Sequence, residues 1–187
     1  MHCWKTLNVQ KQYGHDRIFI FSILFVFAVF SLFYISLNAF RHEPVSDKLF
    51  SLFVLVLVLT YPIHKLIHFI PIARYRKNIR FSIERKVGIF PVLNMQIREP
   101  IVKFRYMVSL VSPFIVINSV FMIGAISFPS FRHYFTFLLA YHSGLCLIDL
   151  LYAKHLFKTP KHALIEETEK GFQILIPYTK ASTDLSA

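Results

Sequence analysis

The sequence predicts an all-α membrane protein with four transmembrane helices and small β elements on the cytoplasmic side. Of its 187 residues, 55% are hydrophobic and only 17% are charged, and 21 are phenylalanine. A soluble domain of this length needs more polar side chains to cover its surface. In addition, four apolar stretches reach the length of about 20 residues that a helix needs to cross a bilayer. The third observation is the distribution of lysine and arginine between these stretches.

The four predicted helices differ in the polar residues that they contain. The first has no charged residue, whereas the second half of the second contains Pro62, His64, Lys65 and His68. Pro113 and Asn118 lie in the third helix, and His142 and Asp149 lie in the fourth. The predicted helices cover residues 18–39, 49–70, 106–128 and 133–153.

The basic residues predict the orientation of the chain. Seventeen of the 21 lysines and arginines lie before the first helix, in the loop 71–105 or after residue 153, and only three lie in the other two loops. Because lysine and arginine concentrate in cytoplasmic loops, we expect both ends of the chain and the loop 71–105 to be cytoplasmic in a multi-pass protein of the cell membrane. This distribution also explains the net charge of +11 without nucleic-acid binding.

Alternating apolar residues predict short strands on the cytoplasmic side. Residues 79–83 and 93–98 alternate with the period of a strand and predict a hairpin within the loop. Residues 163–166 and 172–176 predict a second strand pair in the tail 154–177. We treat residues 1–177 as one domain and predict that the small, polar residues 178–187 are disordered.

Three ionisable residues within the predicted helices are candidates for function, because burying such groups in a membrane costs free energy. His64 and His68 are four residues apart, so they lie on one face of a helix and can reach a single ion. At a rise of about 1.5 Å per residue, His64, Asp149 and His68 lie about 22, 24 and 28 Å from the outer ends of their helices. Two imidazoles and one carboxylate form the ligand set of a catalytic zinc site.

Simpler interpretations of the same residues remain open. Among nine histidines, two can fall four residues apart by chance, and an interfacial histidine can simply reach water. Asp149 could instead form a structural ion pair with Lys65 or Lys154. His142 is predicted to hydrogen-bond within the bundle, to Asn118, rather than to bind metal. Cys3 and Cys146 suggest neither a disulfide framework nor a cysteine-rich zinc site.

The segment His64-Lys65-Leu66-Ile67-His68 resembles the His-Glu-x-x-His motif of zincins. Residues 62–177 resemble a small bacterial family of multi-pass membrane proteins, a domain of unknown function regarded as zincin peptidases and distant in kind from the site-2 proteases. The resemblance implies that His64 and His68 are zinc ligands, with Asp149 as the third, near the cytoplasmic face. It extends over several further motifs, which are Gly88-Ile89-Phe90-Pro91, Arg105-Tyr106, Ser112-Pro113-Phe114, Ser143 to Asp149, Lys158-Thr159-Pro160 and Gly171-Phe172.

Lys65 departs from the motif at the position of the catalytic general base. In a zincin this residue is a glutamate that takes a proton from water at the metal. A lysine side chain is protonated at neutral pH and cannot accept that proton. Glu84 and Glu99 could replace the glutamate only if the loop folded over the site. We therefore expect a degenerate metallopeptidase homologue that is inactive or impaired.

Two other classes of function remain as alternatives. The first is a membrane scaffold or regulatory protein without metal, and the second is a small transporter that uses the intramembrane histidines and aspartate. The expected partners are the lipid bilayer and a membrane-protein or peptide client, with zinc as the expected cofactor.

Overall fold

A computed structural model describes residues 2–39, 44–73, 79–87, 90–97, 100–168 and 171–176. Between residues 74 and 99 it describes the backbone of two strands and no side chain. The side chains of Glu84 and Glu99, the basic segment 74–78 and the predicted disorder of residues 178–187 therefore lie outside the described part.

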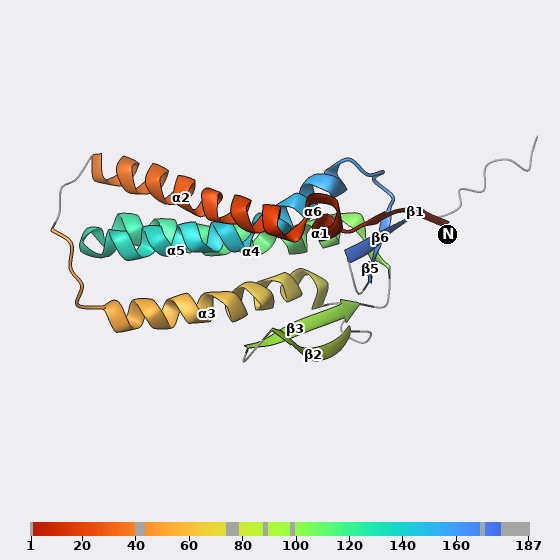
Figure 1. Ribbon diagram of the computed structural model, residues 1–187, viewed down its shortest axis with the longest axis horizontal. Helices are drawn as coiled ribbons and strands as arrows, with labels where there is room; N and C mark the ends of the chain where they lie inside the picture. The colour runs from red at the N-terminus through yellow and green to blue at the C-terminus, as the bar shows by residue number, and fades with distance from the viewer. Residues whose placement is uncertain are drawn as a thin grey trace, which may run out of the picture.

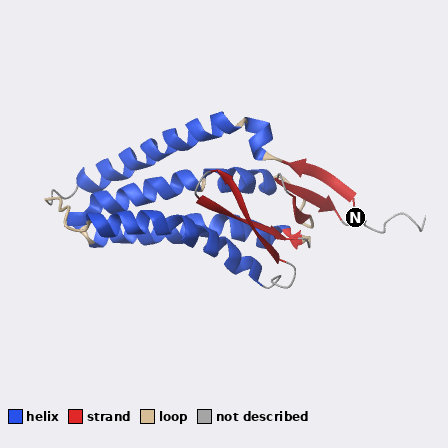
Figure 2. Ribbon diagram, turned by 60° about the horizontal axis from the view of Figure 1, so that its bottom comes forward, coloured by secondary structure: helices blue, strands red, loops and turns tan. Residues whose placement is uncertain are grey.

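The long helices run side by side along the longest axis of the molecule, and the sheets gather at the end where the N-terminus lies (Figures 1 and 2). Helix α2 packs against α5, and α4 packs against α3, α5 and α6. A short helix α1 (Val9–Tyr13) precedes α2, and a 3-10 turn η2 (Pro129–Phe131) precedes α5. The helices of the bundle are α2 (His15–Ala39), α3 (Phe50–Phe69), α4 (Lys103–Ser127), α5 (Arg132–Leu145) and α6 (Leu147–Phe157).

Three helices are long and apolar enough to cross a membrane: α2, α3 with its continuation to Ala73, and α4. The fourth predicted helix, 133–153, is not a straight rod. It is a pair of helices bent by 49°, Pro129–Leu145 and Leu147–Phe157, that can form one further broken span. Ser143 and Gly144 precede the bend, and the Ser143 hydroxyl donates to the carbonyl of Leu139. Both features favour a helix kink.

Large apolar side chains cover the outside of α2 and α3. Phe27 on α2 and Val58 on α3 are 66% and 64% exposed, a surface that suits lipid and not water. Inside the bundle, Ile117 and Phe121 of α4 pack with Leu138 and Leu139 of α5. The helices thus have an apolar interior and an apolar exterior, as expected for a membrane bundle.

The predicted strand pair of the tail is confirmed as β5 (Leu164–Thr168) and β6 (Gly171–Ile176), which are antiparallel. Two unpredicted strands extend it, β1 (His2–Leu7) beside β6 and β4 (Ile101–Val102) beside β5. The strand order is β1-β6-β5-β4. At the turn into β6, Gly171 has φ +149°, and a Cβ there would strike the carbonyl oxygen of Leu7. Only glycine lets β1 approach β6 so closely.

The predicted loop hairpin is also confirmed. Strands β2 (Ile79–Val87) and β3 (Phe90–Ile97) pair antiparallel, with Ile79 opposite Ile97 and Val87 opposite Phe90. They form a separate two-stranded sheet.

The four-stranded sheet packs on the helix ends through a second apolar core. Phe172 and Ile174 alternate along β6 with less buried neighbours, so one face of the strand points inward. They pack with Tyr106 and Leu110 of α4 and with Leu156 of α6. This core joins the sheet to α4 and α6, which carry part of the candidate site.

Candidate metal centre

Helix α3 places both histidines of the predicted motif on its inner face. His64 is buried and His68 is partly buried, whereas Leu66 on the opposite side is exposed. The Nε2 atoms of His64 and His68 lie 3.0 Å apart. This is the arrangement expected for residues one helical turn apart whose rings converge.

Helix α6 brings Asp149 to the same point. Its Oδ2 atom lies 3.3 Å from Nε2 of His64 and 3.4 Å from Nε2 of His68. With metal–nitrogen distances of about 2.0–2.1 Å, two ligand atoms of a tetrahedral zinc site lie about 3.3 Å apart. The three donor atoms therefore fit zinc in type and in spacing.

The bend between α5 and α6 positions Asp149. Gly144 lies against α2, and a Cβ at this residue would meet the Cγ2 atom of Val26 and come within 3.4 Å of the Ser22 carbonyl oxygen. The close approach of α2 thus requires the glycine that also permits the bend. Asp149 lies in the first turn of α6, directly after this bend.

The other ring nitrogen of His68 is held by a backbone carbonyl of α4. Its Nδ1 lies 2.7 Å from the oxygen of Ser109, so this nitrogen donates and Nε2 carries the lone pair. In a regular helix that carbonyl would accept from the N–H of residue 113, but Pro113 has no N–H. The Ser109 hydroxyl in turn donates to the carbonyl of His68 at 2.6 Å. Pro113 therefore supplies the acceptor that orients His68.

The other ring nitrogen of His64 faces α5. Its Nδ1 lies 3.1 Å from Nε2 of His142, whose Nδ1 lies 2.8 Å from Oδ1 of Asn118. The predicted hydrogen bond between His142 and Asn118 is thus confirmed. The contact between His142 and His64 was not predicted, nor was the position of the Cys146 sulfur 3.4 Å from Nε2 of His142. His64, His142 and Cys146 form a second group of side chains close enough to share an ion.

The alternative ion pairs of Asp149 do not form within the described residues. Asp149 contacts the two histidines of α3 and neither Lys65 nor Lys154. Lys65 is half-buried and makes no hydrogen bond or ion pair in the described part of the chain.

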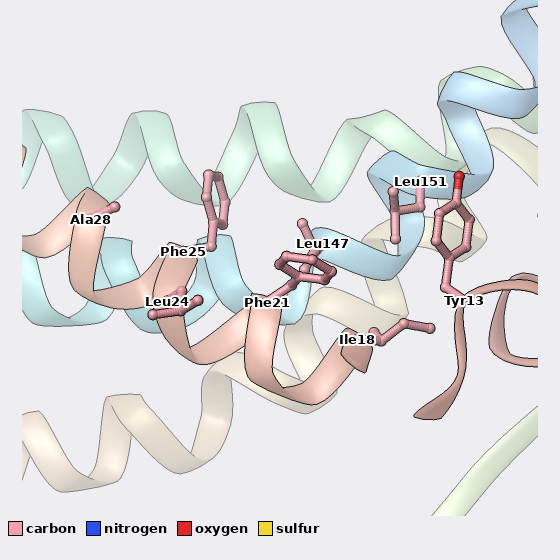
Figure 3. Close-up of a pocket in the computed structure, with 8 residues that line it drawn as sticks. All are labelled: Tyr13, Ile18, Phe21, Leu24, Phe25, Ala28, Leu147 and Leu151. Atoms are coloured by element: carbon pink, nitrogen blue, oxygen red, sulfur yellow. The ribbon is translucent and has the colours of Figure 1, made fainter. Parts of the chain in front are cut away.

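An apolar cavity of about 410 Å³ lies on the other side of α6, between it and α2 (Figure 3). Leu147 and Leu151 line it, and on a helix they face away from Asp149. The hydroxyl of Tyr13 at one end is engaged with Nε2 of His155 at 3.3 Å. The cavity is therefore separate from the histidine cluster and offers little polar chemistry.

Two histidines one turn apart and a carboxylate from a distant helix, inside an apolar bundle, place the chain in the class of zincin-like membrane proteins. A family model described as "Putative zincin peptidase" matches residues 57–164, which is more than half of the chain and includes all three donors. The chain belongs to this family, as its resemblance predicted. No curated protein and no solved structure matches it significantly.

Proposed function

We propose that the chain is a degenerate intramembrane metallopeptidase homologue that binds one zinc ion through His64, His68 and Asp149. The observation that carries the proposal is the convergence of two Nε2 atoms and one carboxylate oxygen at 3.0–3.4 Å from one another. Bound zinc would supply Lewis acidity for polarising a carbonyl or a water molecule. Within the described chain, the two imidazoles and the carboxylate of Asp149 are the groups that would hold it.

The proposed loss of activity rests on Lys65. A protonated ammonium group beside the first histidine cannot serve as general base, and it repels a dication. Asp149 is the only carboxylate of the histidine cluster among the described side chains, and as a ligand it is not available for proton transfer. Binding of zinc or of a client is then the function that remains.

The proposed setting is a protein that crosses the cell membrane four times, with both ends in the cytoplasm. The bend between α5 and α6 is compatible with one broken span, and the sheets lie at the N-terminal end of the bundle (Figure 1). The excess of lysine and arginine supports a cytoplasmic position for this end. Cys3 is exposed and Cys146 is buried, so an impermeant maleimide should label Cys3 in inverted vesicles and not in intact cells. Labelling in intact cells would reverse the orientation.

The proposed partners are the lipid bilayer and a membrane-protein or peptide client. The sheet of β2 and β3 has only two strands, so among the described strands each keeps one unpaired edge. An extended peptide can add to such an edge through backbone hydrogen bonds.

Metal analysis of the detergent-purified protein tests the metal site. We expect about one zinc ion per chain, lost in His64→Ala, His68→Ala and Asp149→Ala variants that remain folded. Leu66→Ala, on the outer face of α3, is the matched control and should retain zinc. If folded protein supplied with zinc binds none, the metal site is refuted and a metal-free scaffold is the better interpretation.

A further inference from the structure

The ring nitrogen of His64 that faces away from the proposed metal belongs to a chain of buried polar groups. This chain runs from α3 through α5 to α4 and back to α5. His142 at its centre is completely buried, and Ser143 is 2% exposed. Buried groups of this kind must satisfy their hydrogen bonds with one another, so the direction of each bond can be worked out.

The direction is determined from the far end. The Ser143 hydroxyl donates its one proton to the carbonyl of Leu139 at 2.8 Å, so towards Asn118 it can only accept. The Asn118 amide nitrogen, 3.1 Å away, is therefore the donor to Ser143. The amide oxygen of Asn118 then faces His142 and accepts from its Nδ1 at 2.8 Å.

The same logic extends to His64. Because Nδ1 of His142 carries the proton, its Nε2 has the lone pair in the neutral ring and accepts from Nδ1 of His64 at 3.1 Å. His64 is then protonated at Nδ1, and its Nε2 presents a lone pair towards His68 and Asp149. This is the tautomer that a metal ligand needs, and second partners of this kind commonly enforce it.

We infer that His142, Asn118 and Ser143 are positioning residues that hold His64 in the tautomer and ring orientation required for binding zinc through Nε2. The inference rests on the proposed zinc site. None of the three residues touches the ion in this arrangement. They act through His64 alone, as the Ser109 carbonyl acts through His68.

Cys146 offers a competing arrangement of the same groups. Its sulfur lies 3.4 Å from Nε2 of His142 and 3.8 Å from Nδ1 of His64, so the three atoms could share an ion of their own. Such an ion would occupy the lone pair of His142 and require removal of the proton from Nδ1 of His64. The two arrangements exclude each other, and the positioning chain needs no buried thiolate.

The test compares zinc affinities, measured by chelator competition, of full-length protein in detergent. His142→Phe keeps a ring but removes the acceptor, and we expect its affinity to fall roughly 10- to 100-fold. His142→Gln offers an amide oxygen as acceptor and should recover most of the loss. Cys146→Ser should bind zinc like the unaltered protein. A second readout is the tautomer of His64 from ¹⁵N chemical shifts, which should be Nδ1–H in the unaltered protein and mixed in His142→Phe.

Each outcome separates the hypotheses. Unchanged affinity in folded His142→Phe, or a His64 tautomer that does not respond, would overturn the positioning role while His64→Ala still reports on the zinc site itself. Loss of metal in Cys146→Ser, with a thiolate charge-transfer band in the cobalt-substituted protein, would replace the chain by a site at His64, His142 and Cys146. Retention of zinc in His64→Ala, His68→Ala and Asp149→Ala would refute the proposed site and with it this inference.

Discussion

Replacing Pro113 by alanine should weaken zinc binding while stabilising the helix that carries it. The carbonyl of Ser109 accepts from Nδ1 of His68 at 2.7 Å and from the Ser112 hydroxyl at 3.1 Å, so both of its lone pairs are used. An alanine would add a backbone N–H that regular helix geometry directs at the same oxygen. The new donor must compete with His68.

The two effects have opposite signs. Replacing an interior proline by alanine improves helix stability by up to about 3 kcal/mol. Pro113 is fully buried, and the two methylene groups lost with its ring remove about 1.6 kcal/mol of that gain. The bundle should therefore become about 1 kcal/mol more stable, whereas loss of an outer partner of a ligand lowers metal affinity about tenfold or more.

The assay measures thermal unfolding and zinc affinity of the same preparations. Pro62→Ala is the matched control, because Pro62 lies inside α3 and frees the carbonyl of Val58, a residue that is 64% exposed and has no contact with the cluster. We expect Pro62→Ala to leave zinc affinity unchanged. Equal affinities in the two variants, or an affinity of Pro113→Ala equal to that of the unaltered protein, would refute the argument.

Three further predictions concern packing and chemistry. Gly144→Ala should lower stability by about 1–3 kcal/mol through overpacking against Val26, and adding Val26→Ala should restore it in thermal unfolding. Gly171→Ala should detach β1, because its Cβ would strike the carbonyl oxygen of Leu7. Hydrogen exchange in residues 2–7 should then rise, and unchanged protection would contradict this role. Lys65→Glu restores the general base, so we expect zinc-dependent cleavage of a fluorogenic peptide pool that Lys65→Gln lacks. Equal activity of the two variants would show that a carboxylate here is not limiting.

The features that the sequence predicted correctly depend on short-range patterns. The pairing of β5 with β6 and of β2 with β3 follows from alternation on either side of a turn, and both hairpins are present. The convergence of His64 and His68 follows from helical periodicity alone. Strand β1 was missed because its partner β6 lies more than 160 residues further along the chain. No local pattern encodes such a pairing.

The sequence by itself determined the apolar helices, their basic flanks, the histidine pair and its departure from the zincin motif at Lys65. Only the tertiary structure showed the bend that places His142 and Asp149 on the two sides of the His64 ring. It also showed that Pro113 releases the carbonyl that holds His68. The reason is physical. Periodicity shows which face of a helix a residue occupies, but the partner across an interface depends on how closely two helices approach and where they bend, and residues such as Gly144 determine that only through contacts with distant parts of the chain.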